Sequence, residues 1–220
     1  MGIISIEKSD NLLWLGRYTE RVHTLLKAYF VNSDYMIEND PLQYTDFCNK
    51  IGIPNVYETR HVFVDKYPFD EGDSNSIISN LNRAYDNAIV MREYIGTETM
   101  AFIQLAIDDI KAAERGNTPM ADLMFVIDHI LAFWGCVDDI IDDMQIRNMI
   151  KLGKGLERVD IYLRLDKSYK EVLKEYKRMK QYLMKSGIQY DQPVLDTADA
   201  MMEDPEVNYQ TLRNLLLKLI

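Results

Sequence analysis

The chain has 220 residues, of which 47% are hydrophobic and 27% charged, and its formal net charge is −10. This composition is typical of a globular protein, and the length is sufficient to bury a large core. The negative charge argues against nucleic-acid binding and against attraction to anionic membranes. The first residues turn acidic too early for a signal peptide, and no apolar run predicts a membrane-spanning helix, so we expect a cytoplasmic protein.

Helical spacing of apolar residues dominates the chain from its beginning. The first predicted helix runs to about Glu38, and the dipeptide Asp40-Pro41 ends it. A short helix is expected over 41–51. The segment 52–73 contains two glycines and two prolines, and we predict a long connection there. Long connections often carry function, so this segment is a candidate functional loop.

Two further helices are predicted over 74–95 and from Thr97 onward, the latter ending at an Arg-Gly-Asn-Thr turn. Pro119 suits the first position of the next helix. The apolar period then continues to about Leu165, which is too long for one ordinary helix. We therefore expect a bend or a short break within 135–148.

The C-terminal part begins with a charged amphipathic helix that ends at Gly187. Pro193 and Pro205 then separate two short terminal helices. No change of composition marks a linker. The sequence therefore predicts one all-α domain over 1–220, a bundle of about six to eight helices.

One phrase occurs twice in the chain. The residues from Leu15 to Leu26 align with those from Leu152 to Leu163, and a glycine followed four positions later by Glu-Arg recurs in register. A glycine inside a helix costs about 1 kcal/mol relative to alanine. Gly16 and Gly153 at matching positions therefore predict a close approach of another backbone or of a ligand.

The repeated Glu-Arg pairs have two interpretations. In the first, the two helices meet at their glycines and the charges pair: Glu20 with Arg17, Arg21 or Arg158, and Glu157 in the same way. Buried pairs of this kind more often fix geometry than perform chemistry. In the second, a groove between the two helices forms a ligand pocket.

An acidic string offers an alternative function. If the string is helical, residues four positions apart lie one turn apart and could share Mg²⁺, which binds diphosphate groups. The string resembles the aspartate-rich motif of squalene and phytoene synthases, which are also all-α, although such enzymes need a second motif. The plainer interpretation is a solvated acidic patch. The four aspartates are Asp138, Asp139, Asp142 and Asp143.

A second alternative is a carboxylate metal site in the bundle. Glu20 and His23 have the Glu-x-x-His spacing of di-iron bundle proteins. The second copy offers Glu157 and Asp160 at the same spacing. We predict no metal or cofactor as the main interpretation, and these four residues are the candidates if one is bound.

The motif residues resemble the Alpha-E family, a bacterial helical domain with a recurring Glu-Arg motif. Its first signature, a middle segment and a second Glu-Arg motif are all matched. The matching residues, which are also the candidate groove residues, are Asn11, Trp14, Gly16, Arg17, Tyr18, Glu20, Arg21, Asn87, Arg92, Glu98, Gly153, Glu157 and Arg158.

The resemblance is strongest over 6–165, and 166–220 forms divergent C-terminal helices. Tyr85 and Lys154 stand where the family often has arginine. The family's activity is not established, and its members occur with ATP-grasp-type ligases and transglutaminase-like peptidases. The resemblance therefore implies an accessory domain for peptide ligation or modification, with a protein partner or a peptide-like ligand, no catalytic residue and no cofactor.

Overall fold

The computed structural model describes residues 5–38 and 43–220. The protein is 77% helical, with eleven helices and no strand among these residues. This confirms the all-α prediction, while the number of helices exceeds the expected six to eight. The excess arises from short helices such as α3 (Arg60–Lys66) and α5 (Arg92–Ile95), which are too brief to show apolar periodicity.

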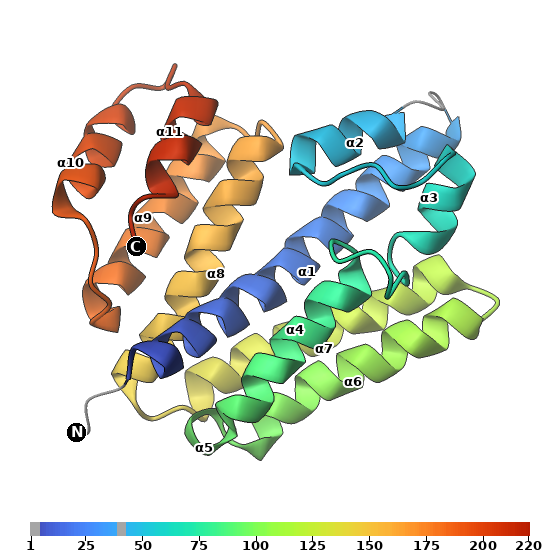
Figure 1. The fold of residues 1–220 in the computed structure, drawn as a ribbon, viewed down its shortest axis with the longest axis horizontal. Helices are drawn as coiled ribbons and strands as arrows, with labels where there is room; N and C mark the ends of the chain where they lie inside the picture. Colours follow the sequence, from blue (N-terminus) through green and yellow to red (C-terminus); the bar gives the residue numbers. More distant parts are fainter. Residues whose placement is uncertain (1–4, 39–42) are drawn as a thin grey trace.

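One long helix organises the arrangement of the others. In Figure 1, α1 (Ile6–Glu38) runs diagonally through the centre, with α4 (Ile77–Val90), α6 (Thr97–Arg115) and α7 (Pro119–Asp139) on one side. On its other side, α8 (Met144–Arg164) crosses it. The chain then continues through three further helices: α9 (Tyr169–Ser186), α10 (Gln192–Met201) and α11 (Tyr209–Leu216).

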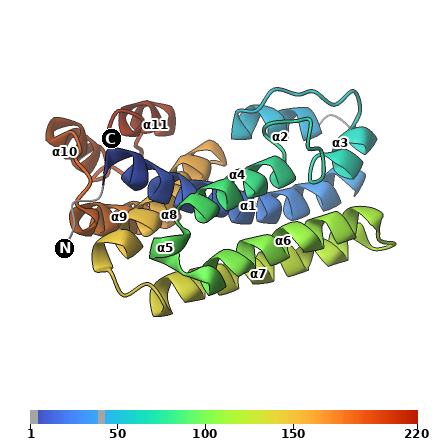
Figure 2. The same cartoon turned by 60° about the horizontal axis from the view of Figure 1, so that its bottom comes forward.

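Two hydrophobic clusters fill the interior, and α8 belongs to both. Its first turns place Ile146 and Ile150 in the larger cluster, with α1, α4, α6 and α7. Its later turns place Leu156 and Leu163 in the smaller cluster, with α9, α10 and α11. Figure 2 shows α8, α9, α10 and α11 at one end of the molecule, beside the first turns of α1. The α1–α8 contact therefore joins the two clusters.

The prediction of a helix-free connection over 52–73 is wrong. The structure places α3 within it, after α2 (Gln43–Ile51). The Thr59 hydroxyl accepts a hydrogen bond from the Val62 amide and so caps α3. Phe63 is fully buried among aromatic rings from α1 and α2. Burial of this ring stabilises a helix that is too short for the sequence pattern to predict.

Two other predicted boundaries agree with the structure, and one predicted helix is divided. The first helix ends at Glu38 as predicted, while its Asp40-Pro41 stop signal lies outside the described residues. The expected break within 135–148 is present between α7 and α8. The helix predicted over 74–95 is instead interrupted at Met91, between α4 and α5.

Among the described helices, α7 alone is long and apolar enough to meet a membrane-span criterion, with a mean hydropathy of 1.6. This finding is weak support for a membrane role, because core helices meet the same criterion. One face of α7 packs into the larger cluster through Val126, Ile130 and Phe133. Its composition therefore agrees with a role in the core.

Candidate functional site at the crossing of α1 and α8

The two motif glycines lie at the point where α1 and α8 touch. A Cβ atom added at Gly16 would lie 2.0 Å from the carbonyl oxygen of Ile150. A Cβ atom added at Gly153 would lie 2.0 Å from the carbonyl oxygen of Leu13. No side chain fits at that distance from a backbone oxygen. The expected close approach is therefore between the two helices, and it is reciprocal.

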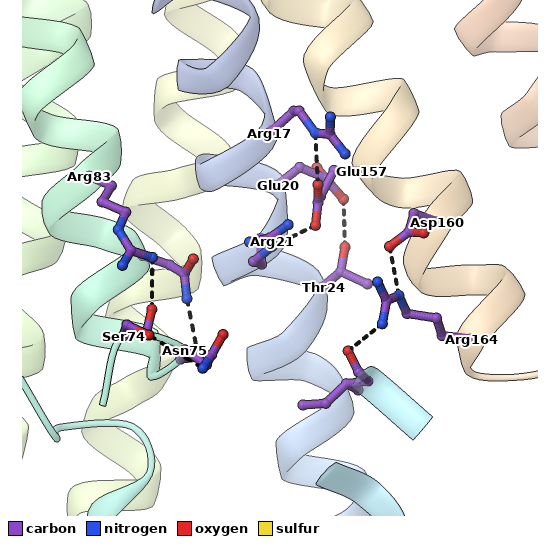
Figure 3. Close-up of polar contacts among 12 residues, drawn as sticks. Arg17, Glu20, Arg21, Thr24, Ser74, Asn75, Arg83, Glu157, Asp160 and Arg164 are labelled. Atoms are coloured by element: carbon purple, nitrogen blue, oxygen red, sulfur yellow. Dashed lines mark hydrogen bonds and ion pairs between the residues drawn. The ribbon is translucent and has the colours of Figure 1, made fainter. Parts of the chain in front are cut away.

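The Glu-Arg pairs are reciprocal in the same way, and Figure 3 shows the two pairs made by Glu157. The guanidinium groups of Arg17 and Arg21 in α1 donate to the two carboxylate oxygens of Glu157 in α8, at 3.1 and 2.6 Å. Arg158 in α8 donates to Glu20 in α1 at 2.6 Å. Each glutamate thus binds arginine from the opposite helix and not its own sequence neighbour. We call these five residues the Glu-Arg clasp.

The two glutamates of the clasp are buried. Glu20 and Glu157 are 0% and 1% exposed. Burial alone would raise the pKa of Glu20, but the nearby His23 and the charge of Arg158 outweigh this effect and lower that pKa to about 2. Burial opposes the charge of Arg158 too, yet Glu20 raises the pKa of its guanidinium. Both partners are therefore charged at neutral pH.

Ionised carboxylates bound to arginine are poorly suited to proton transfer at neutral pH. The Thr24 hydroxyl donates a further hydrogen bond to Glu20 at 2.7 Å. The second oxygen of Glu20 is buried and has no hydrogen-bond partner within the described part of the chain, and His23 Nδ1 lies 3.5 Å from the first without a hydrogen bond. The geometry of the clasp supports helix positioning as its role.

The surroundings of the clasp form two flanks related by the repeat, in which residue 23 corresponds to 160 and residue 27 to 164. The Asp160 flank contains Arg21, Glu157, Asp160 and Arg164. There Asp160 accepts hydrogen bonds from Arg164 and from Arg213 of α11, both at 2.7 Å. Arg164 also donates to the carbonyl of the last α2 residue. The arginines of this flank are thus all paired.

The His23 flank contains Glu20, His23, Lys27 and Arg158. His23 stands where the other flank has Asp160, and Lys27 stands where it has Arg164. Lys27 makes no hydrogen bond or ion pair with any described residue. On the Asp160 flank every arginine is therefore paired with a carboxylate, whereas on the His23 flank Lys27 has no described partner.

Each flank borders a cavity, and the two cavities differ in size. The cavity on the Asp160 flank has a volume of about 90 Å³ and reaches Gly52 and Ile53 at the start of the 52–73 connection. The cavity on the His23 flank has a volume of about 370 Å³ and lies between α1, α2 and the end of α8. The cavity that lies beside the 52–73 connection is therefore the smaller of the two.

Aromatic rings support the arginines on α1. The Arg17 guanidinium lies 4.7 Å from the centre of the Trp14 ring, and the Arg21 guanidinium lies 5.9 Å from that of Tyr18. At the position equivalent to Arg17, the Lys154 ammonium lies 3.9 Å from the centre of the Trp134 ring. Cation–π contacts thus recur in both copies, although lysine replaces arginine in the second.

The middle motif residues are engaged elsewhere. The Asn87 amide donates to the backbone of its own helix, and the exposed Arg92 donates to the Thr97 hydroxyl. Glu98 is exposed in the first turn of α6. Asn11 is half-buried in the early turns of α1. The polar contacts of Asn87 and Arg92 are local, so these residues do not join the clasp.

The acidic string does not form the expected helical ladder, because α7 ends at Asp139 and the next four residues are not helical. Asp138 pairs with Lys151 at 2.5 Å, and Asp143 caps α8 by accepting from two backbone amides. Asp142 is exposed between them. The spacing argument for a shared magnesium ion is therefore wrong.

The four candidates for a bundle metal site also do not assemble as ligands. Glu20 and Glu157 bind arginines of the clasp, and Asp160 binds two further arginines. His23 has no hydrogen-bond partner at either ring nitrogen in the part of the chain that the structure describes. Among the described residues, no group of three or more histidine, cysteine or acidic side chains could hold a metal ion.

Sequence reasoning missed several members of the site. Arg213 comes from the C-terminal helix α11, and Glu175 of α9 lies 3.5 Å from Arg158. Neither belongs to a repeated phrase, and neither position is marked by spacing. Lys154 shows a further unpredicted property, since burial lowers its pKa to about 8. Its position, about one turn before Glu157 on a predicted helix, was the sequence feature that could have placed it near the clasp.

The comparison with protein families decides what the repeated motif represents. Residues 8–201 match the model of Alpha-E, described as a predicted alpha-helical domain with a conserved ER motif. The chain belongs to the Alpha-E family. The match extends beyond 165 through α9 and α10, so the family resemblance is wider than the sequence motifs indicated. Neither curated proteins nor solved structures give a match.

Proposed function

We propose that this Alpha-E protein is a cytoplasmic accessory domain that binds a protein partner or a peptide-like ligand. It would serve an ATP-grasp-type ligase or a transglutaminase-like protein in peptide ligation or modification, as the family resemblance implies. The observation that carries the proposal is the Glu-Arg clasp. Its charged groups bind one another across α1 and α8, which supports a scaffold and not a proton-transfer site.

The outward face of α7 supports a protein partner. Met124, Phe125 and Leu131 are 49%, 56% and 50% exposed. Met124 and Leu131 are seven residues apart, so they lie on the same face of the helix. A group of exposed apolar side chains on one face often marks a surface for protein contact.

The experiment is a binding measurement with the ATP-grasp-type ligase or the transglutaminase-like protein encoded beside this gene. Isothermal titration calorimetry should detect a complex with a dissociation constant near or below about 10 μM. Met124→Asp should weaken it at least about tenfold, because a charge would be buried at the contact. Absence of both partner genes, or absence of any complex, would contradict the proposal.

A matched control is available on the opposite part of the bundle. Met184 on α9 is 49% exposed, the same fraction as Met124. Met184→Asp should leave the affinity within about twofold of the unmodified protein, since surface substitutions away from a contact change little. If both variants weaken binding equally, the face of α7 is not the contact surface.

A further inference from the structure

The cavity on the His23 flank has an unusual charge for this protein. Its described lining residues include four cationic side chains and no carboxylate, although the whole chain carries a net charge of −10. A volume of about 370 Å³ lies within the range of small-molecule sites, roughly 300–1,000 Å³. The cations come from different parts of the chain and line the same cavity. They are Lys27 on α1, Lys50 on α2, Arg158 on α8, and Lys167 in the connection between α8 and α9.

Three of these cations have no partner within the described residues. The ammonium groups of Lys27, Lys50 and Lys167 make no ion pair or hydrogen bond there. Arg158 differs, because it is held by Glu20 and Glu175. The three lysines therefore present uncompensated positive charge, which favours a bound anion.

His23 provides a second and independent observation. It lines the cavity and is only 7% exposed. Among the described residues neither ring nitrogen has a hydrogen-bond partner, although Nδ1 lies 3.5 Å from the Glu20 carboxylate. A buried polar group without a partner is costly. A ligand that reached this wall of the cavity would offer such a group a hydrogen-bond acceptor.

The Asp160 flank is the internal comparison, because there the cations of the repeated motif pair with carboxylates of the protein itself. Its smaller cavity is lined by Arg21 and Arg164, which Glu157 and Asp160 balance. On the His23 flank the position of Asp160 is taken by histidine, so the balancing carboxylate is missing. The two flanks share a backbone arrangement and differ in whether their charges are satisfied internally.

We propose that the cavity on the His23 flank binds a small ligand through an oxyanion, either a phosphate or a carboxylate group. Lys27, Lys50 and Lys167 would pair with its oxygens, and the His23 ring would line the inner wall. Lysine is a common binder of phosphate as a point charge. An anion site here goes beyond the proposed function, because it would exist whichever partner protein binds.

The test uses pyrophosphate and citrate as probes, titrated without Mg²⁺ at constant ionic strength and followed by calorimetry. Saturable one-to-one binding of either probe is expected, and the preferred probe assigns the phosphate or the carboxylate source. Lys27→Gln and Lys50→Gln should each weaken binding about tenfold. Both side chains are exposed and unpaired, so the variants should fold normally by circular dichroism.

Lys177→Gln is the matched control, because Lys177 is an exposed lysine on α9 outside the cavity lining. It should leave probe affinity within about twofold, since surface charges away from the site are screened. No saturable binding of either probe below about 10 mM would overturn the proposal. Equal weakening by Lys177→Gln and Lys27→Gln would overturn it as well, because attraction would then be non-specific.

Discussion

The two flanks of the Glu-Arg clasp come from one repeated phrase, yet they use it differently. On the Asp160 flank, Arg21 binds Glu157 and Arg164 binds Asp160, so both cations are paired within the protein. On the His23 flank a histidine replaces the carboxylate and Lys27 has no described partner. The helix crossing is thus kept in both copies, while a change at two positions leaves one side able to attract an anion.

The largest effect is expected from Gly16→Leu, which removes the crossing on which both flanks depend. A side chain at Gly16 would overlap the carbonyl oxygen of Ile150, and the backbone cannot move aside without separating α1 from α8. We expect loss of folding, or a loss of at least about 5 kcal/mol in the free energy of unfolding measured by urea titration.

Gly135→Leu is the control for that substitution. Gly135 lies in α7 and no atom lies within 4 Å of an added Cβ. The variant should gain up to about 1 kcal/mol, because leucine is a better helix former than glycine. If Gly16→Leu is as stable as Gly135→Leu, the close approach does not explain the motif glycine.

The next effect separates the two flanks. Glu157→Gln should cost about 4 kcal/mol of unfolding free energy, because it leaves Arg17 and Arg21 without their carboxylate. Glu20→Gln should cost less, about 3 kcal/mol, because Arg158 keeps Glu175 as a second partner. Chemical denaturation of both variants measures the difference. The reverse order would show that the paired flank is not the stronger one.

The pH dependence of the unfolding free energy tests the charge of Glu20 on the His23 flank. The folded protein lowers the pKa of Glu20 from 4.5 to about 2, so the charged form stabilises the fold above pH 4.5. That contribution, about 3 kcal/mol, is lost as the pH falls from 4.5 toward 2. The stability difference between the unmodified protein and Glu20→Gln should therefore shrink across this range. A difference that stays constant would argue against an ionised Glu20.

The smallest effect compares equivalent cations. Arg164→Gln should cost about 1 kcal/mol, because it breaks bonds to Asp160 and to the Ile51 carbonyl. Lys27→Gln should change stability by less than about 0.5 kcal/mol, since the side chain is exposed and unpaired. Thermal unfolding measures both. A larger cost for Lys27→Gln would mean that this lysine holds the fold and is not free for a ligand.

The helices themselves were largely predictable. Apolar periodicity, Pro119 and Gly187 located most boundaries, and the two interior glycines indicated a close contact. The helix α3 was missed because it spans too few residues to show a period, and tertiary burial of Phe63 stabilises it.

The partners within the site were less predictable. The sequence could place Glu20 near several arginines but could not choose among them, because the choice depends on how α1 and α8 cross. The ladder proposed for Asp138 to Asp143 failed for a related reason: apolar periodicity does not show where α7 stops. The contact between Arg213 and Asp160 could not be predicted from the sequence, because it depends on how the C-terminal helices pack against α8.

The most direct test of the clasp is a pair of double-mutant cycles on the free energy of unfolding. The first couples Glu20→Gln with Arg158→Gln, and the second couples Glu20→Gln with Arg21→Gln. We predict a coupling energy of about 2 kcal/mol across the helices and less than about 0.5 kcal/mol between the sequence neighbours. Coupling confined to Glu20 and Arg21, or no coupling in either cycle, would contradict a clasp formed between the two motifs.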